Sequence, residues 1–540
     1  MNRLASKIDT GSNGFRINSE AYQILVDTLR QRQEWAISGG PDRERSIERH
    51  LSRGKLLVRD RIDMITDRRS AFLEFSTLAG YGLYHDEVPG AGIVTGIGLI
   101  HNVPWVIIAN DATVKGGSLV PAAIKKHVRA QDIAAENSLG VIYLVDSGGA
   151  FLPLQDEIFP DKDHFGGSFY RQARLSAAGL PQLSVVLGGC TAGGAYVPAL
   201  SDEVIMVEGI GRIFLGGPPI VKAALGEIIE PDELGGAQLH TQLSGVSDYR
   251  AATEAEAYGR LREICQTTNQ RKISDGHDWI DRLSPVPPAY DPTEIYGIVS
   301  ADDRIPFDAT EIIARMVDGS EFSEFKPEWG TSMVTGFARI WGHLIGIIAN
   351  NGIIFSEAAL KATHFIELCE QRRIPLLFLQ NTSGYMVGRD SEVAGIAKHG
   401  AKMVAAVANA TVPKYTVLIG GSYGAGNYGM CGRGFNPRML FAWPNSRIAT
   451  MAADTAETVL VDIRRAGLKG DQTSDDELDA IRAEIRSQYQ TQSDPYYATA
   501  RLWDDGLIDP VDTRDVLGLC LALAARQDEP ARGPGLVYRM

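Results

Sequence analysis

Two short glycine turns carry the residues best suited to chemistry in this chain. Residues 192–196 read AGGAY and residues 424–428 read GAGNY, and each turn follows a short apolar run. Glycine lets a ligand approach the main chain closely, and a turn that opens a helix presents N–H groups with no intrahelical partner at the positive end of the helix dipole. Such groups can stabilise an oxyanion that develops on a thioester or ureido carbonyl. The alternative is that the glycines only permit tight strand-to-helix turns; two equivalent turns favour the ligand-binding interpretation.

The two turns belong to a sequence repeat that spans both halves of the chain. Thr95 returns as Thr335, an offset of 335 − 95 = 240 residues, and each is followed by glycine. The turn DSGG at 146–149 returns as NTSG at 381–384. A duplicated fold provides two similar half-sites that can face each other, which suits an enzyme that must hold two large reactants at once.

Each half shows the pattern of βαβ units, in which a strand, a helix and a second strand lead into a glycine turn. The expected strands are residues 103–109, 141–145, 183–188, 344–349, 376–380 and 415–420. The expected helices lie within residues 20–61, 121–137, 356–371 and 474–486. Residues 283–292 are rich in proline, which cannot continue a helix or a central strand, so they read as a linker. We therefore predict domains at residues 22–283 and 292–535.

The composition is typical of a soluble globular protein. Apolar residues make up 44% of the chain, charged residues 22%, and the net charge is −14, which argues against nucleic acid as the main partner. No run reaches the roughly 18 apolar residues that a membrane span needs, and the N-terminus lacks the apolar core of a secretory signal. We expect a cytoplasmic bacterial protein, with the mitochondrial matrix as the less favoured location.

Several other candidate motifs are weaker. Gly424 begins a GxGxxG pattern and Gly420 begins GxSxG, but no histidine follows His399 to complete a hydrolase triad. The five cysteines lack a CxxC pair and four histidines lack metal-ligand spacing, so we expect reduced thiols, structural or solvent-facing histidines, and no metal. These residues are Cys190, Cys265, Cys369, Cys431, Cys520, His127, His164, His364 and His399. A basic cluster at Lys125, Lys126 and Arg129 is either a solvated helix face or a contact for a phosphorylated ligand.

These residues carry a resemblance to a known family. The chain resembles the carboxyltransferase (β) subunit of biotin-dependent acyl-CoA carboxylases, within the methylcrotonyl-CoA and geranyl-CoA branch. The motifs that carry it are RGKLL at 53–57, ANDATVKGG at 109–117, YLVDSGGA at 143–150, DHFG at 163–166, CTAGGAYVPA at 190–199, IGGSYGAGNYGMCGR at 419–433 and WDDGLIDP at 503–510. Together they cover nearly the whole chain.

The resemblance implies an α/β protein with two tandem crotonase-like (ClpP/crotonase) domains. The N-terminal domain would hold acyl-CoA, and the C-terminal domain would hold carboxybiotin, carried by a separate α subunit with the biotin carboxylase and biotin carboxyl carrier functions. Biotin N1 would accept the substrate proton, without a metal in this subunit. The family's active site lies between two β subunits of a β hexamer, within an α6β6 holoenzyme.

The resemblance also assigns residues to roles. Gly193 and Gly194 would donate N–H groups to the thioester enolate, and Ala425 and Gly426 would donate to the ureido oxygen of biotin. The further acyl-CoA contacts would be Ala192, Ala195, Gly148, Gly149, Lys125, Lys126 and Gly217. The further biotin-side contacts would be Gly384, Tyr423, Gly424, Asn427 and Tyr428.

Some positions depart from the methylcrotonyl-type pattern. Leu119 and Val120 stand where two aromatic residues are usual, and Leu154 and Gly167 stand where arginine is usual. Gly216 replaces an alanine, and residues 452–455 (AADT) replace a glycine-rich stretch. Smaller or more apolar side chains could enlarge the acyl pocket for a longer chain, or these changes could lie outside the pocket and be neutral. They leave the reaction class intact.

The resemblance favours carboxyl transfer from carboxybiotin to a branched enoyl-CoA, with 3-methylcrotonyl-CoA giving 3-methylglutaconyl-CoA as the first choice. Geranyl-CoA is the alternative, and a propionyl-CoA carboxylase is less favoured. A sodium-pumping decarboxylase would run the same chemistry in reverse and would need membrane subunits. A non-catalytic scaffold is disfavoured because the glycine turns are intact in both halves.

Overall fold

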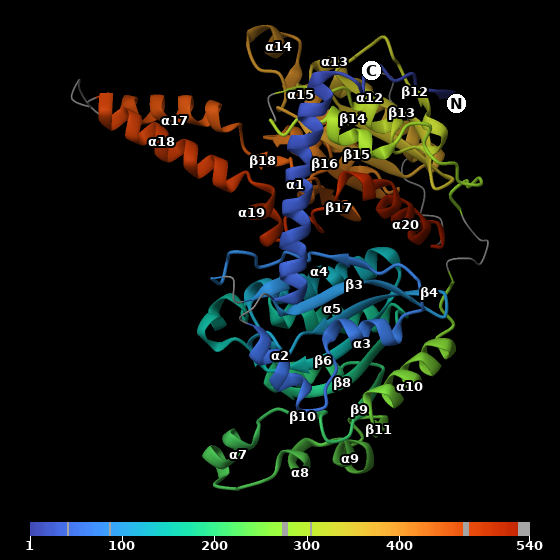
Figure 1. Ribbon diagram of the computed structural model, residues 1–540, viewed down its shortest axis with the longest axis vertical. Coiled ribbons are helices and arrows are strands. Elements are labelled where there is room, and N and C mark those ends of the chain that lie inside the picture. The colour runs from blue at the N-terminus through green and yellow to red at the C-terminus, as the bar shows by residue number, and fades with distance from the viewer. Residues whose placement is uncertain (40–42, 86–87, 273–278, 303–304, 468–474, 528–540) are drawn as a thin grey trace. The chain divides into compact units, whose positions relative to one another are not determined.

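The computed structural model describes residues 1–39, 43–85, 88–272, 279–302, 305–467 and 475–527. The chain divides into two compact units, each with its own β-sheet (Figure 1). The N-terminal unit comprises Gln31–His277 and Ala500–Leu502. The C-terminal unit comprises Met1–Arg30, Asp278–Thr499 and Trp503–Met540.

The N-terminal unit contains an eight-stranded sheet with the order β11-β9-β8-β6-β4-β3-β2, and β10 pairs with β8. Neighbouring strands from β4 to β11 run parallel, whereas β3 is antiparallel to both β4 and β2. The strands are β2 (Leu73–Phe75), β3 (Ile93–Ile100), β4 (Val103–Asn110), β6 (Gly140–Ser147), β8 (Gln182–Thr191), β9 (Glu203–Val207), β10 (Arg212–Phe214) and β11 (Tyr249–Ala251).

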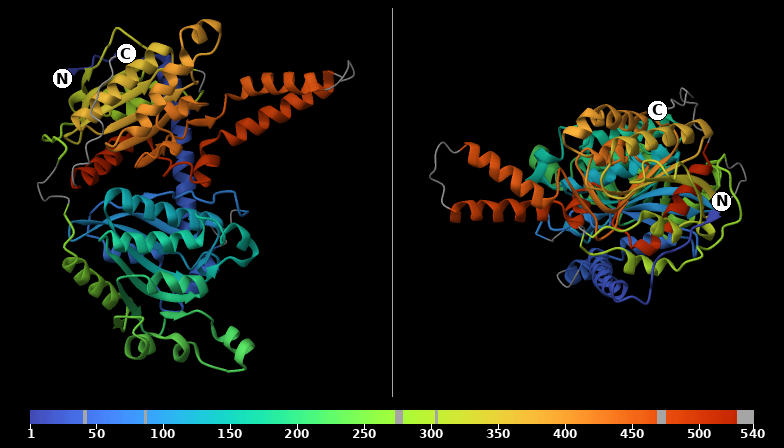
Figure 2. Two further views of the ribbon diagram at one scale, coloured as in Figure 1. Left: turned by 180° about the vertical axis from the view of Figure 1, so that it is seen from behind. Right: turned by 90° about the horizontal axis from the view of Figure 1, so that it is seen from above.

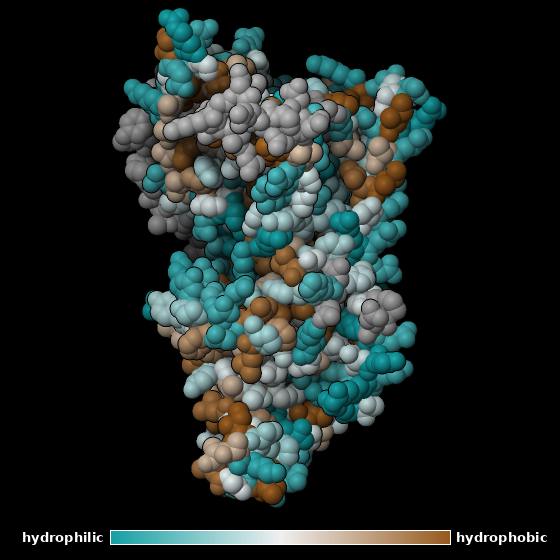
Figure 3. Space-filling view, turned by 90° about the vertical axis from the view of Figure 1, so that its left-hand side faces the viewer, coloured by the Kyte–Doolittle hydropathy of each residue, from teal (hydrophilic) through white to brown (hydrophobic). Residues whose placement is uncertain are grey.

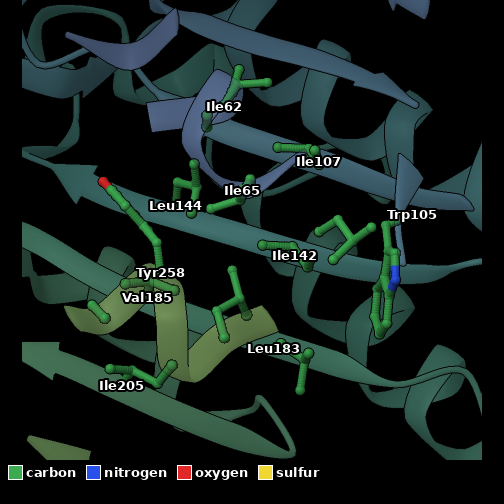
Figure 4. Packing of buried hydrophobic residues seen from close by; sticks show 14 of the residues in the cluster. Ile62, Ile65, Trp105, Ile107, Ile142, Leu144, Leu183, Val185, Ile205 and Tyr258 are labelled. Carbon is green, nitrogen blue, oxygen red and sulfur yellow. The ribbon is translucent and has the colours of Figure 1, made fainter. Parts of the chain in front are cut away.

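Helices cover both faces of this sheet. The main ones are α2 (Glu44–Leu51), α3 (Val58–Ile65), α4 (Pro121–Asn137), α5 (Phe165–Ala177) and α10 (Glu254–Thr267), whereas α7 (Pro218–Leu225) lies away from the sheet with no buried residue (Figure 1). On one face, side chains of α3 and α10 pack against alternate strand residues such as Ile107, Ile142 and Val185 (Figure 4). The intervening residues, among them Ile108 and Tyr143, point to the opposite face and line a cavity with residues of α4. The glycine turn therefore follows a strand that is buried on both faces.

The sheet of the C-terminal unit repeats this topology. Its order is β1-β12-β13-β14-β15-β16-β17, and β18 pairs with β16 in the way that β10 pairs with β8. The antiparallel pair β13 and β14 corresponds to β3 and β4, and parallel strands continue through β15, β16 and β17. The strands are β1 (Asn2–Arg3), β12 (Glu321–Glu324), β13 (Met333–Ile340), β14 (His343–Asn350), β15 (Leu376–Thr382), β16 (Lys414–Tyr423), β17 (Met439–Ala442) and β18 (Arg447–Ala449).

The helices of the C-terminal unit include a projecting hairpin. The main helices are α13 (Ser356–Arg372), α15 (Ile396–Asn409), α17 (Ala453–Gly467), α18 (Asp475–Gln492) and α20 (Thr513–Ala525), and α1 (Asn13–Ser38) begins in this unit. Helices α13 and α15 pack on β15 through a shared apolar core. Helices α17 and α18 lie side by side and project away from the sheet (Figure 2).

Most predicted elements are confirmed. The helix expected at residues 121–137 has those bounds in α4, and the six expected strands are all present. The expectation that each glycine turn opens a helix with a useful dipole is wrong. The helices that follow the glycine turns, α6 (Tyr196–Ala199) and α16 (Gly426–Gly429), have four residues each, so they add little dipole to the backbone N–H groups.

Candidate functional site

The first glycine turn begins where β8 ends. Residues Ala192–Ala195 form a single 3-10 turn that leads into α6. Ala192 adopts φ of 53°, a left-handed conformation that costs an alanine free energy. The N–H of Tyr196 bonds to Gly193 O at the end of this turn. The amides of Gly193 and Gly194 precede it, in the first turn of a helix, where N–H groups have no intrahelical partner.

A second turn, at the end of the neighbouring strand β6, adjoins the first. The N–H of Gly149 donates to Ser147 Oγ over 3.1 Å, and the N–H of Gly148 donates to Gly117 O over 3.0 Å. A Cβ added to Gly194 would lie 3.3 Å from Ser147 Oγ. Gly149 adopts φ of +84°, which favours glycine at this position. The predicted acyl-side residues of these two turns are thus brought together at one edge of the sheet.

A pocket of about 740 Å³ opens beside these turns. Gly148 and Thr191 form part of its wall, and basic side chains form another part. The basic residues are Arg49, Arg53, Lys55 and Arg212. The sequence did not predict this basic pocket, because α2, β10 and the glycine turns are far apart along the chain. The one available signal was RGKLL at 53–57, which belongs to the family pattern.

A network of buried, ion-paired side chains lies at the base of this pocket. Both carboxylate oxygens of Asp146 accept from Lys55 Nζ at 2.9 Å, and Arg61 approaches Asp146 at 3.3 Å. Arg61 also binds Glu254 through two hydrogen bonds of 3.0 Å. Asp146 is the first residue of the DSGG turn, so this network fixes the turn from behind. The pKa of Arg61 is raised; its burial opposes the charge, and the hydrogen bonds and charge of Glu254 outweigh that penalty.

The other predicted acyl-side residues lie elsewhere. Lys126 is buried, its Nζ donates to Gly90 O and Ile93 O, and burial lowers its pKa to about 8. Lys125 is exposed and donates to Arg501 O. Gly217 precedes α7 and does not line the basic pocket. Nor does it line a second, apolar cavity beside Gly194, which is described next. The solvated-face interpretation is therefore wrong for Lys126, and a phosphate contact for these residues stays a prediction.

A small apolar cavity lies on the other side of the same turns. It has a volume of about 20 Å³, and Gly194, Ser147 and Leu119 contribute to its wall. The remaining lining residues are Ile108, Asn110, Ile124, His127, Tyr143, Val145, Phe165, Ser168 and Val197. Leu119, one of the departures from the methylcrotonyl-type pattern, thus belongs to this wall. Ala195, which follows Gly194, is buried.

The C-terminal unit builds the equivalent turns from equivalent contacts. The N–H of Gly384 donates to Thr382 Oγ1 over 3.0 Å, as Gly149 does to Ser147. The left-handed position is filled by Gly424, with φ of +56°, and the N–H of Asn427 closes the next turn on Gly424 O. The amides of Ala425 and Gly426 precede that donor, and Gly193 and Gly194 occupy the matching positions of the first turn.

The remaining predicted biotin-side residues divide by exposure. Tyr423 is buried at the end of β16, and the Asn427 amide donates to Ser422 Oγ over 2.7 Å. Tyr428 is 51% exposed and so can contact a ligand or partner directly. Ser422 lies inside β16, fully buried, and its Oγ donates to Gln380. The GxSxG pattern therefore forms a strand and not the sharp turn that a hydrolase requires.

Comparison with known proteins decides the family. The carboxyl transferase domain matches residues 49–534. The chain belongs to the carboxyl transferase domain family. It is 55% identical to the biotin-dependent 3-methylcrotonyl-coenzyme A carboxylase beta1 subunit of Mycobacterium tuberculosis, over 97% of this chain and 98% of that protein. It is 51% identical to a probable mitochondrial methylcrotonoyl-CoA carboxylase beta chain of Drosophila melanogaster, over 97% of this chain and 93% of that protein.

A solved structure confirms the fold of this carboxyl transferase. The β subunit of P. aeruginosa geranyl-CoA carboxylase superposes with a TM-score of 0.89 at 42% identity, with full coverage of both chains. The predicted family, the α/β fold with tandem crotonase-like domains, and the assignment as an enzyme of the carboxyltransferase class are confirmed. The domain bounds and the roles of individual residues stay predictions.

Neither a metal cluster nor a membrane-spanning helix occurs in the described part of the chain. No group of three or more His, Cys, Asp or Glu side chains there is arranged to hold a metal ion. Nor does any helix in those ranges combine the length and apolarity needed to cross a membrane. All five cysteines are buried and free, and burial raises the pKa of each thiol.

Proposed function

We propose that this chain transfers a carboxyl group from carboxybiotin to a branched enoyl-CoA, namely 3-methylcrotonyl-CoA, giving 3-methylglutaconyl-CoA. The observation that carries the proposal is the pair of equivalent glycine turns, one of which lies between a basic pocket and an apolar cavity. The names of the similar proteins from Mycobacterium and Drosophila support the acyl group.

The N-terminal unit offers three regions, one each for the phosphates, the thioester and the acyl group of an acyl-CoA. The guanidinium groups of Arg49 and Arg53 would attract the phosphates of CoA, since arginine binds phosphate through paired N–H donors, whereas Arg212 in the same pocket is paired with Asp232. The thioester would reach the turns, where Gly193 and Gly194 donate to the oxygen as negative charge develops on it. The acyl group would then lie in the apolar cavity beside Gly194. The small present volume of that cavity implies that its wall adjusts when the acyl group enters.

The C-terminal unit suits the neutral ureido group of biotin. Ala425 and Gly426 would donate to its oxygen, and Gly384 at φ of +109° keeps the opposite turn free of a side chain. A Cβ on Gly426 would lie 2.9 Å from Thr382 Oγ1, so this cradle admits only glycine without adjustment. Carboxybiotin, carried by the α subunit, would supply the carboxyl group, and biotin N1 would accept the substrate proton once carbon dioxide has left it. Side chains of this chain need only bind, orient and exclude water.

A specific observation also favours geranyl-CoA as the second candidate. The solved structure with a TM-score of 0.89 is a geranyl-CoA carboxylase subunit, and Leu119 lines the cavity where the methylcrotonyl-type pattern has an aromatic residue. A shorter aliphatic side chain there leaves more space for a long acyl chain. Propionyl-CoA is less favoured as the substrate, because the chain is only 32% identical to the carboxyltransferase subunit of a propionyl-CoA carboxylase.

Assembly follows the same proposal. We expect a β hexamer within an α6β6 holoenzyme, in which neighbouring β subunits complete each other's active sites. Around α7, four large apolar side chains are exposed, as subunit contacts would require, and Figure 3 shows apolar surface at this end of the N-terminal unit. These are Leu215, Ile220, Leu225 and Ile228. A cytoplasmic location stays a prediction, since similar proteins include bacterial and mitochondrial forms.

The test is a substrate panel. The full chain, assembled with a biotin-carrying α subunit, is assayed for ATP- and bicarbonate-dependent carboxylation of methylcrotonyl-, geranyl-, propionyl- and acetyl-CoA. We expect the highest kcat/KM with methylcrotonyl-CoA. A preference for propionyl-CoA would overturn the assignment of the acyl group, and carboxylation of none of the four would overturn the proposed function.

A further inference from the structure

One polar side chain in the acyl cavity has no role in the proposed carboxyl transfer. His127, on α4, lines the cavity together with Gly194 and is 7% exposed. Its ring stacks on Tyr143, with ring centroids 5.7 Å apart and planes inclined by 23°. Its Nε2 atom is fully buried and has no hydrogen-bond partner among the residues that the structure describes. A buried polar atom without a partner is costly, so its retention needs a reason.

Neighbouring polar groups of the cavity wall are engaged elsewhere. The Tyr143 hydroxyl donates to Gln182 Oε1 over 2.8 Å and accepts from Gln131 over 3.1 Å. Ser168 Oγ donates to Phe165 O over 2.7 Å. Rotation of these hydroxyls towards the imidazole would break bonds already made. The histidine therefore depends on whatever enters the cavity for a partner.

The internal repeat shows that the fold does not require a histidine here. Helices α4 and α13 correspond with an offset of 356 − 121 = 235 residues, so Ala362 is the counterpart of His127. Ala362 is fully buried in the core of its own unit. The counterpart of Tyr143 is Phe378, which lacks the hydroxyl. The polar pair is thus peculiar to the unit in which we place the acyl group.

The imidazole is neutral at pH 7, because burial lowers the pKa of His127 to about 4. A neutral ring is a weak base at such a pKa and carries no charge to attract phosphate. It can still exchange one hydrogen bond with a small polar partner. The cavity volume of about 20 Å³ is sufficient for one water molecule.

We infer that His127 determines acyl-chain selectivity by disfavouring acyl-CoA substrates whose hydrocarbon fills this cavity. A short branched acyl group leaves room for a water at the ring, whereas a long chain excludes the water and leaves the imidazole nitrogen without a partner. Sites with buried polar groups reject ligands that cannot satisfy them. The inference rests on the proposed function, which places the acyl group beside Gly194.

The test compares kcat/KM for geranyl-CoA and methylcrotonyl-CoA in the assembled holoenzyme. His127→Leu keeps the side-chain volume close to that of histidine and removes the polar atoms, so the geranyl to methylcrotonyl ratio is expected to rise about 5- to 50-fold. His127→Gln places an amide near the position of Nε2 and is expected to hold the ratio within about threefold of wild type. His127→Met is the second apolar variant, in case the leucine variant does not fold.

Trp105→Phe is the matched control. Trp105 Nε1 is also buried without a partner among the described residues, but it lies in the core on the opposite face of the sheet (Figure 4). Its removal is expected to leave the ratio unchanged. A ratio within about twofold of wild type in both folded apolar variants would overturn the inference while leaving the proposed function intact, as would an equal shift in Trp105→Phe. Carboxylation of neither substrate by the wild type would overturn both.

Discussion

The two glycine turns share a backbone plan but differ in charge. In the N-terminal unit, the turn at the end of β6 begins with Asp146, which is held by Lys55 and Arg61. In the C-terminal unit the equivalent residue is Asn381, whose amide oxygen accepts from the N–H of Gly421 over 3.3 Å. On the neighbouring strands β8 and β16, Gly188 and Gly420 leave space for these two side chains, because a Cβ on either glycine would collide with the side chain beside it. The two units therefore share the space beside the turn but differ in the charge of the side chain that fills it.

The difference matches the two reactants that we propose. CoA carries phosphates, and its unit lines a pocket with four basic side chains. The biotin ring carries no phosphate, and its turn is supported by neutral amides and a hydroxyl. Backbone N–H groups serve both carbonyl oxygens equally well, because hydrogen-bond donation to an oxyanion does not depend on the side chain. We therefore propose that the side chains around the turns determine which reactant each unit binds.

The largest expected effect separates the two turns by function. Gly194→Val and Gly426→Val each place side-chain atoms where a ligand oxygen must approach, so carboxyl transfer should fall at least about 100-fold in both. Acyl-CoA binding, measured by calorimetry on the oligomer, should be lost only in Gly194→Val.

Gly259→Val and Gly434→Val are the controls, since a Cβ at either glycine meets open space. Their activity should stay within a few-fold of wild type. Unchanged transfer from free carboxybiotin in either turn variant would contradict the oxyanion assignment.

The next prediction exchanges the charge between the turns. Asp146→Asn removes the carboxylate that faces Lys55 and Arg61, and we expect the free energy of unfolding to fall by about 2–4 kcal/mol, because a buried cation loses its partner. Asn381→Asp introduces a carboxylate at a half-buried position and should destabilise by a smaller amount. Denaturant unfolding of both variants measures this effect. Two stability losses below about 0.5 kcal/mol would show that the charge difference has no structural basis.

The smallest effect concerns the left-handed residue of each turn. Ala192→Gly relieves an alanine at φ of 53° and should raise the free energy of unfolding by up to about 1 kcal/mol. Gly424→Ala imposes the same strain and also brings a Cβ to 3.1 Å from Thr450 O, so it should lower that free energy by about 1–2 kcal/mol. Thermal unfolding of the two variants gives the comparison, and equal shifts of the same sign would contradict it.

The sequence alone determined the repeat, the strands and the identity of the turns. Hydrophobic periodicity and glycine are local signals, which is why they predict a helix at residues 121–137 with the bounds of α4 and single out the turns that contain Gly193 and Gly426. The same signals could not show that α6 and α16 are too short to carry a useful dipole, because helix ends depend on what packs against them.

Only the tertiary structure showed which basic side chains meet in one pocket. Lys125 and Lys126 are the conspicuous basic pair in the sequence, yet Lys126 is buried on backbone carbonyls, whereas Arg49 and Arg212 are far apart in sequence and meet in one pocket. His127, expected to be structural or solvent-facing, is a cavity wall residue whose Nε2 has no partner among the described residues. Burial and long-range contact set these properties, and both arise only when distant strands and helices pack together.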